Sequence, residues 1–315
     1  MDVTAPTPAP AAPPAPPPTR RNPGPSWGYR FLCLCDRVLP EFIFRPLRAL
    51  GTAVALANMP AQRRDSRAYL ATVLPRPPTL RDLFRHFFAF EENLMLKLRV
   101  AHGRAHRGVL APGSGPNDFA GWLARDEVAL LGTFHVGDSD LLGFLLGGYE
   151  RRKIYLVRLR VANSHDTEKL GALFGEWVRF VWVNEPAEMI FALKDAIANP
   201  EGAAVAMQCD RADYSSRGEA FDFLGARRLF PFTIYHLALI FQKPVLLSVG
   251  VPGAPGESVL HSSPIFRPIA GEPRPAALAR ARAHFQNFLH DLEKLLRANP
   301  YLWFNFTPLN PPVSP

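Results

Sequence analysis

The sequence predicts an α/β protein with a central mixed, mostly parallel sheet flanked by helices. Short apolar runs that carry few charges recur along the chain, which is typical of strands buried on both faces. Segments with helical spacing lie between these runs, and alternation of strands and helices favours a parallel sheet covered by helices. With 315 residues, of which 48% are hydrophobic, the chain is long enough for a large buried core.

The individual elements follow from local patterns. Strands are expected at residues 127–134, 153–157, 180–183, 203–207 and 244–249. A long helix is expected after Thr79, because Asp82 completes a helix cap and apolar residues then recur at helical spacing as far as Leu98. Further helices are expected at 166–177, 186–198 and 232–241. A last helix carries an apolar face made of Phe285, Phe288, Leu289, Leu292, Leu295 and Leu296.

Composition divides the chain into three parts. Residues 1–25 hold ten of the 33 prolines and are expected to be a disordered Pro/Ala-rich tail, since they have too few apolar side chains to fold. Residues 26–100 are expected to form a helical, membrane-apposed region, and residues 101–315 a catalytic α/β domain. Within the helical region, residues 27–59 mix arginines with aromatic and aliphatic residues. This mixture suits either an anionic membrane surface or a core-packing helix with solvated arginines.

Charge and cysteine content restrict the partners and the compartment. The 36 Lys and Arg residues exceed the 28 Asp and Glu residues by eight, which favours an anionic partner such as a phospholipid surface or an acidic carrier protein. Nucleic acid is not expected as a partner, because no reader motif accompanies the charge. Three cysteines are too few for a disulfide framework, the amino terminus lacks a signal-peptide pattern, and no uninterrupted apolar run reaches about 20 residues. We therefore expect a protein of the reducing cytoplasm that lies on a membrane without crossing it.

The clearest chemical signal is a histidine followed five positions later by an aspartate, directly after a predicted strand. His135 and Asp140 stand in the segment GTFHVGDSD, where Gly137 allows a turn. Ligands of open α/β sheets bind at the carboxyl ends of the strands. His86 and Glu91 have the same spacing inside a predicted helix, where five residues rotate the side chains about 140° apart. That second pair is not expected to cooperate.

A carboxylate that holds one nitrogen of a neutral imidazole leaves the other nitrogen free to take a proton from a hydroxyl group. We therefore expect His135 to act as a general base and Asp140 to orient it. No G-x-S-x-G or S-x-x-K pattern supports a covalent serine intermediate, so direct attack by the activated hydroxyl is preferred. One alternative is a buried histidine paired with a turn carboxylate for structural reasons. Another is a metal site of His135, Asp138 and Asp140, which lacks a second His or Cys cluster close in sequence.

Several other motifs follow the H-x4-D pattern in order. They are the basic pair Arg158 and Arg160 after the next predicted strand, and the segments MPAQRR (59–64), MQCDR (207–211), FDFLG (221–225), PFT (231–233), KPVL (243–246) and PYLWFNF (300–306). Together they resemble the lysophospholipid acyltransferase superfamily over about residues 37–306. Within it, the chain is most similar to the bacterial lipid A late acyltransferases and to related enzymes of lipid or polyene-pigment pathways.

The resemblance implies an O-acyltransferase that moves a fatty acyl group from acyl carrier protein or a coenzyme A thioester to a hydroxyl of a lipid-like acceptor. His135 and Asp140 match the catalytic pair of that family, and Arg160 and Asp210 fall where it places a polar acceptor-site pair. No resident cofactor or metal is implied. The expected location is peripheral, at the cytoplasmic face of the bacterial inner membrane. The acceptor is left open among lipid A, another glycolipid and a polyene.

Four arginines flank the expected turn at residues 221–225, where guanidinium groups suit bidentate binding of phosphate: Arg211, Arg217, Arg227 and Arg228. We expect at least two of them to be ordinary solvated loop charges and Arg211 to contribute to substrate binding. Gly225 is expected to serve the same site by a close backbone approach or a positive φ angle.

A second reading of the whole chain is a non-catalytic membrane-surface lipid-binding protein that uses the basic aromatic segment 27–59. The intact pair of His135 and Asp140 favours the enzyme. The terminal aromatic residues Trp303, Phe304 and Phe306 are expected to pack in the core rather than to line an acyl pocket.

Overall fold

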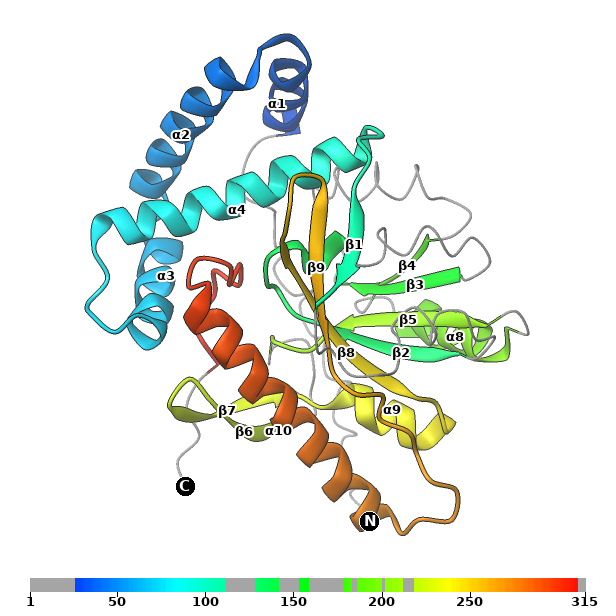
Figure 1. Cartoon of the computed structure of the whole chain (residues 1–315). Helices are drawn as coiled ribbons and strands as arrows, with labels where there is room; N and C mark the ends of the chain where they lie inside the picture. The colour runs from blue at the N-terminus through cyan, green and yellow to red at the C-terminus, as the bar shows by residue number, and fades with distance from the viewer. Residues whose placement is uncertain are drawn as a thin grey trace, which may run out of the picture.

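A computed structural model of the chain is shown in Figure 1. It describes residues 26–111, 128–141, 153–158, 178–182, 186–199, 202–211 and 218–310. The predicted tail 1–25, the predicted helix 166–177 and the end residues Glu127 and Val183 of two predicted strands lie outside the described residues.

A seven-stranded sheet forms the centre of the described structure (Figure 1). Its strands, in their order across the sheet, are β1 (Arg107–Leu110), β9 (Glu257–Ser262), β8 (Val245–Pro252), β2 (Ala129–Thr133), β5 (Ala203–Gln208), β3 (Lys153–Arg158) and β4 (Val178–Trp182). Neighbouring strands pair in parallel, except that β8 and β9 are antiparallel. The prediction of an α/β fold with a mixed, mostly parallel sheet is therefore confirmed.

Burial on both faces explains why the predicted strands are apolar throughout. Leu130 of β2 packs into the larger of two hydrophobic clusters and the next residue, Leu131, into the other, as the two-residue period of a strand requires. Helices α8, α9 and α10 contribute to the larger cluster, whereas Leu96 and Val100 of α4 pack against the smaller one. The sheet is thus the middle layer of the described structure.

Most of the expected helices are present among the described residues. They are α1 (Ser26–Val38), α2 (Glu41–Asn58), α3 (Pro60–Val73), α4 (Leu80–Ala101), the short 3-10 helix η1 (Asp138–Leu141), α8 (Pro186–Ala198), α9 (Thr233–Phe241) and α10 (Arg274–Ala298). The predicted cap of α4 is present in both directions. The Thr79 side chain accepts from the Asp82 backbone N–H, and the Asp82 carboxylate accepts from the Thr79 backbone N–H.

Four strands were not anticipated. Strands β6 (Gly218–Phe223) and β7 (Ala226–Pro231) form an antiparallel hairpin around the expected turn, whose two residues, Leu224 and Gly225, both have positive φ angles of 51° and 74°. Positive φ at both central residues is the geometry of a tight hairpin. The sequence does not predict β1 and β9 as strands, because β1 is exposed along its length and only two of the six residues of β9 are hydrophobic. Pairing with β8 decides that β9 is a strand.

Helix α4 separates the sheet from the amino-terminal helices α1 and α2 (Figure 1). Ion pairs join the two sides: Arg48 of α2 donates to Glu91 of α4 at 2.8 Å, and Arg99 of α4 donates to Asp36 of α1. The side chain of Arg48 is only 3% exposed, so this arginine is buried rather than solvated. Glu91 bonds to Arg48 and does not pair with His86, as expected from helical geometry.

The outer side of α2 is apolar. The helix buries one narrow stripe, and its exposed large hydrophobic residues are Phe42, Ile43, Leu47, Leu50 and Val54. In the described part of the chain, none of the helices combines the length and hydrophobicity needed to cross a membrane.

His86 of α4 joins three distant parts of the chain in the core. Its Nε2 atom donates to the backbone carbonyl of Trp303 at 2.6 Å, and its Nδ1 atom accepts from the Ser66 hydroxyl at 2.7 Å. A neutral ring with its proton on Nε2 makes both bonds. Burial lowers the pKa of His86 to about 4, against a smaller opposing effect of the bond to Trp303.

We predict that acid destabilises the fold through His86. Because the pKa is lowered in the folded state, the stabilisation is fully present above the ordinary value of 6.5 and is lost as the pH falls toward 4. The loss corresponds to about 3 kcal/mol in the free energy of unfolding. Urea unfolding at a series of pH values measures it.

Comparison with His86→Gln isolates this contribution, since burial also lowers the pKa of His106, His261 and His284. The variant should be less stable at pH 7 and show a shallower decline between pH 6.5 and 4. An unchanged slope would refute the assignment.

Candidate active site

The candidate site begins at the carboxyl end of β2, where the backbone makes a turn that requires glycine. Gly137 has a φ angle of +46°, and a Cβ atom there would lie 2.6 Å from the carbonyl oxygen of Gly250 in β8. Its N–H donates to the carbonyl of Leu302 at 2.8 Å. The turn is therefore held between β8 and the carboxyl-terminal segment, and His135 lies at its start.

His135 is held by Asp210, which follows β5. One carboxylate oxygen of Asp210 accepts from the His135 backbone N–H at 2.7 Å, and the other lies 2.8 Å from the ring atom Nδ1. The Asp210 side chain is fully buried and that of His135 is 13% exposed. No described residue bonds to the Nε2 atom, so a neutral ring with its proton on Nδ1 presents a free acceptor at Nε2.

The parallel register explains why these two residues meet. β2 and β5 are neighbours, and Thr133 is paired with Gln208 at their carboxyl ends. His135 and Asp210 each lie two residues beyond this pair, at the same edge of the sheet.

The carboxyl-terminal segment fixes both members of the pair. The Phe304 backbone N–H donates to the His135 carbonyl at 2.6 Å, and the Asn310 side chain donates to the Asp210 carbonyl at 3.1 Å. Trp303 is 2% exposed and stacks on Tyr69, as expected of a packing residue.

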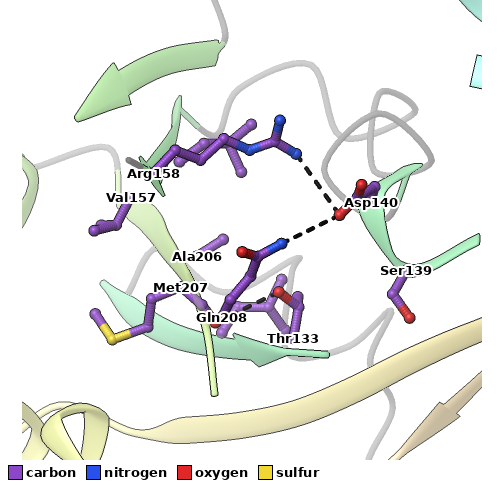
Figure 2. Close-up of a pocket in the computed structure, with 10 residues that line it drawn as sticks. Thr133, Ser139, Asp140, Val157, Arg158, Ala206, Met207 and Gln208 are labelled. Atoms are coloured by element: carbon purple, nitrogen blue, oxygen red, sulfur yellow. Dashed lines mark hydrogen bonds and ion pairs between the residues drawn. The ribbon is translucent and has the colours of Figure 1, made fainter. Parts of the chain in front are cut away.

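Asp140 has different partners from those expected. Its carboxylate forms an ion pair with Lys97 of α4 at 2.5 Å, lies 3.7 Å from Arg158, and accepts a long bond of 3.4 Å from Gln208. Figure 2 shows Arg158 and Gln208 pointing toward it. Burial raises the pKa of Asp140, but the positive charges of Lys97 and Arg158 outweigh burial and hold that pKa well below its ordinary value. Asp140 is therefore a charged carboxylate, and the His135 imidazole donates its hydrogen bond to Asp210 instead.

Local geometry accounts for this difference. Asp140 lies in η1, and its carboxylate faces α4 and the end of β3. Asp138, at the start of the same helix, accepts from Asn93 at 3.0 Å and from the Ser258 hydroxyl at 2.5 Å. Burial raises the pKa of Asp138, and its partners do not offset this effect.

A metal site of His135, Asp138 and Asp140 gains no support from these partners. Among the described residues, no group of three or more His, Cys, Asp or Glu side chains is arranged to hold a metal ion.

A small pocket opens beside Asp140 at the carboxyl ends of β2, β3 and β5 (Figure 2). It is lined by Leu131, Thr133, Ser139, Asp140, Leu156, Val157, Arg158, Ala206, Met207 and Gln208. Three of its polar residues, Thr133, Arg158 and Gln208, come from strand ends, where the parallel sheet gathers them, and Ser139 and Asp140 come from η1.

The other expected site residues are dispersed. Arg211 donates to the side chain of Asn305 at 2.7 Å and so remains next to Asp210. Gly225 occupies the tip of the β6–β7 hairpin, with open space around the position of a Cβ atom, so it serves a positive φ angle rather than a close approach. Arg160 and Arg217 lie outside the described residues.

The remaining two arginines of that expected cluster differ from each other. Arg227 is exposed, whereas Arg228 is buried and donates to the carbonyls of Phe223 and Asn310. The two arginines therefore do not form one phosphate-binding site in this structure.

Sequence reasoning missed Lys97 and Asn310. Lys97 is the only lysine of α4 and interrupts the apolar run Leu-Met-Leu-Lys-Leu, which was the available signal. Asn310 had none, because its contact with Asp210 spans 100 residues of sequence.

Comparison with known proteins does not assign the chain to a family. No protein-family model matches it. A search of the curated proteins finds no significant match either.

We predict that Gly137→Ala disrupts the site far more than Gly225→Ala, although both glycines have positive φ angles. The alanine at position 225 meets open space and should cost about 1 kcal/mol of conformational strain. At position 137 the added methyl group meets a backbone carbonyl, so the cost should reach about 3 kcal/mol or more. Urea unfolding measures both, and equal costs would contradict the close contact with Gly250.

Proposed function

We propose that this chain is an O-acyltransferase in which His135 is the general base. The observation that carries the proposal is the bond between His135 and the buried Asp210 at the carboxyl edge of the sheet, with Nε2 free of partners among the described residues. An imidazole in this state is suited to take a proton from a hydroxyl group. The ordered motifs that resemble the lysophospholipid acyltransferase superfamily support the choice of acyl transfer.

In the proposed reaction, Nε2 of His135 takes the proton of the acceptor hydroxyl while the oxygen of that hydroxyl attacks the carbonyl carbon of an acyl thioester. The tetrahedral intermediate then collapses, the C–S bond breaks, and the thiolate takes the proton from the imidazolium. The products are an ester and a free thiol. Asp210 keeps the ring in the required tautomer and stabilises the imidazolium that forms in between.

The proposed donors are acyl carrier protein or coenzyme A thioesters, and the proposed acceptor is a lipid or glycolipid hydroxyl. The polar pocket beside Asp140 is the proposed place for the acceptor, because it opens at the same strand ends as His135. The proposed acceptor residues are Arg158 beside this pocket, Arg160 two positions further along the chain, and Arg211 next to Asp210.

The amino-terminal helices are the proposed membrane-facing region. α2 exposes an apolar face, and Arg30, Arg37 and Arg45 are exposed on α1 and α2, where they suit anionic headgroups. Peripheral attachment at the cytoplasmic face of the bacterial inner membrane is the proposed location. The same face would serve a lipid-binding protein without catalysis, which is the competing proposal.

We predict that His135→Ala lowers acyl transfer by about 10² to 10⁴-fold, because the general base is lost. Asp210→Asn should also lower turnover, since the amide carries no charge to stabilise an imidazolium. Transfer is measured by mass spectrometry of lipid extracts incubated with purified protein and an acyl thioester. His290→Ala, which changes an exposed histidine of α10, is the matched control and should keep full activity.

Two results would count against the enzyme. Normal turnover by His135→Ala protein would remove the mechanism. Lipid binding by the wild-type protein with no acyl product from any lipid extract would favour the non-catalytic alternative.

We predict that Phe42→Glu combined with Leu50→Glu weakens binding to anionic lipid vesicles by at least about tenfold. These side chains are 77% and 63% exposed, and burying each in the membrane interface would contribute about 1.5 to 3 kcal/mol. Vesicle co-sedimentation measures binding, and salt should weaken it as well, because the arginine contribution is screened.

Ile269→Glu is the control, since it removes another exposed apolar residue far from α2 in sequence. Equal losses in both proteins would show that the outer side of α2 is not the binding face.

A further inference from the structure

Helix α4 contacts the turn after His135 through two side chains one helical turn apart. Asn93 donates to the Gly137 carbonyl at 2.9 Å and to Asp138 at 3.0 Å. Lys97 donates to Asp140 at 2.5 Å. A helix more than 30 residues earlier in the chain thus holds both ends of the segment that follows the candidate base.

The charges around His135 and Asp140 come from every neighbouring element. Among the described residues they are the carboxyl groups of Asp210 after β5 and of Asp138 and Asp140 in η1, and the cations Lys97 of α4, Arg158 at the end of β3 and Arg211 after Asp210. Asp210 touches the imidazole directly. Asp140 lies at the same strand ends, because its carboxylate contacts Gln208, which is two residues before Asp210 and is paired with Thr133, two residues before His135.

Lys97 is the cation best placed to neutralise Asp140. Its contact is 2.5 Å, against 3.7 Å for Arg158, and Gln208 at 3.4 Å carries no charge. The side chains of Lys97 and Asp140 are only 17% and 25% exposed, so solvent screens this pair less than a surface pair. Without Lys97, only the more distant Arg158 would offset the negative charge of Asp140, at strand ends where the imidazole already touches one carboxylate.

A nearby negative charge favours the protonated form of an imidazole, and a protonated imidazole cannot accept a proton from a hydroxyl. We propose that Lys97 is a positioning residue of this site, which neutralises Asp140 and thereby limits the negative charge that acts on His135. The inference rests on the proposed role of His135 as the base. It assigns the aspartate of the H-x4-D motif to charge balance, with Lys97 as its counterion.

The test is an NMR titration of the full-length protein labelled in its histidine rings, with His135→Gln used to assign the His135 signal. At pH 7, Lys97→Met should raise the ratio of protonated to neutral His135 by at least about threefold, which is the effect of one unit charge about 6 Å away in bulk water. Lys97→Arg should restore the wild-type ratio, because it restores the positive charge. Lys294→Met, which removes an equal charge from an exposed pair with Asp291 on α10, should leave the ratio unchanged.

The double variant Lys97→Met/Asp140→Asn separates charge balance from a merely structural contact. It removes both charges, so the ratio should return toward the wild-type value even where the melting temperature does not. If Lys97→Met fails to fold, the double variant compared with Asp140→Asn alone gives the same information, since Lys97 should then lower the ratio by its own charge. An unchanged ratio in Lys97→Met, or no recovery in the double variant, would overturn the proposal.

Activity provides a separate readout. If the chain transfers acyl groups, the acid limb of the pH–activity profile of Lys97→Met should move to higher pH, and Lys97→Arg should move it back. If the wild-type protein transferred no acyl group, the proposed function would be overturned but the role of Lys97 would not, because the NMR ratio tests Lys97 without any measurement of turnover.

Discussion

The double contact between Asp210 and His135 is the interaction on which the rest of the candidate site depends. One carboxylate accepts from both the backbone N–H and the ring of the same residue, so it fixes the position of the chain and the orientation of the imidazole together. A buried carboxylate is costly unless its oxygens are well bonded. The hydrogen bonds to His135 meet that requirement, and they join the two central strands β2 and β5 beyond their last ladder bonds.

Helix α4 connects the candidate site with the amino-terminal helices, because it makes polar contacts on two sides. Toward the sheet, Asn93 and Lys97 hold the turn that carries Asp138 and Asp140. Toward the amino terminus, Glu91 holds the buried Arg48 of α2. An isolated surface ion pair contributes little, but pairs this far from solvent restrict which geometry the helices adopt. The apolar face of α2 and the candidate site around His135 therefore lie on opposite sides of α4.

The carboxyl-terminal residues complete the same site from the other direction. Leu302 and Phe304 bond to the backbone of the turn, Asn310 bonds to Asp210, and the Trp303 carbonyl accepts a hydrogen bond from His86. These contacts join segments that are more than 90 residues apart in sequence. The site is consequently a product of the whole fold, and changes in the last aromatic segment are expected to reach His135 through the backbone.

The sequence by itself determined the fold class, the five apolar strands, the capped helix α4 and the position of His135 at a strand end, because burial and capping leave local patterns. The exposed strand β1 and the mostly polar β9 left no such pattern, since they are strands only through pairing with their neighbours. The partner of His135 was also beyond sequence reasoning. Spacing favours Asp140, five residues away, but the parallel register of β2 and β5 places Asp210 against the ring, while Lys97 and Arg158 hold Asp140 aside. Only the tertiary structure decides between two carboxylates near one imidazole, because hydrogen bonding depends on distance in space and on competing charges, neither of which the spacing of residues along the chain contains.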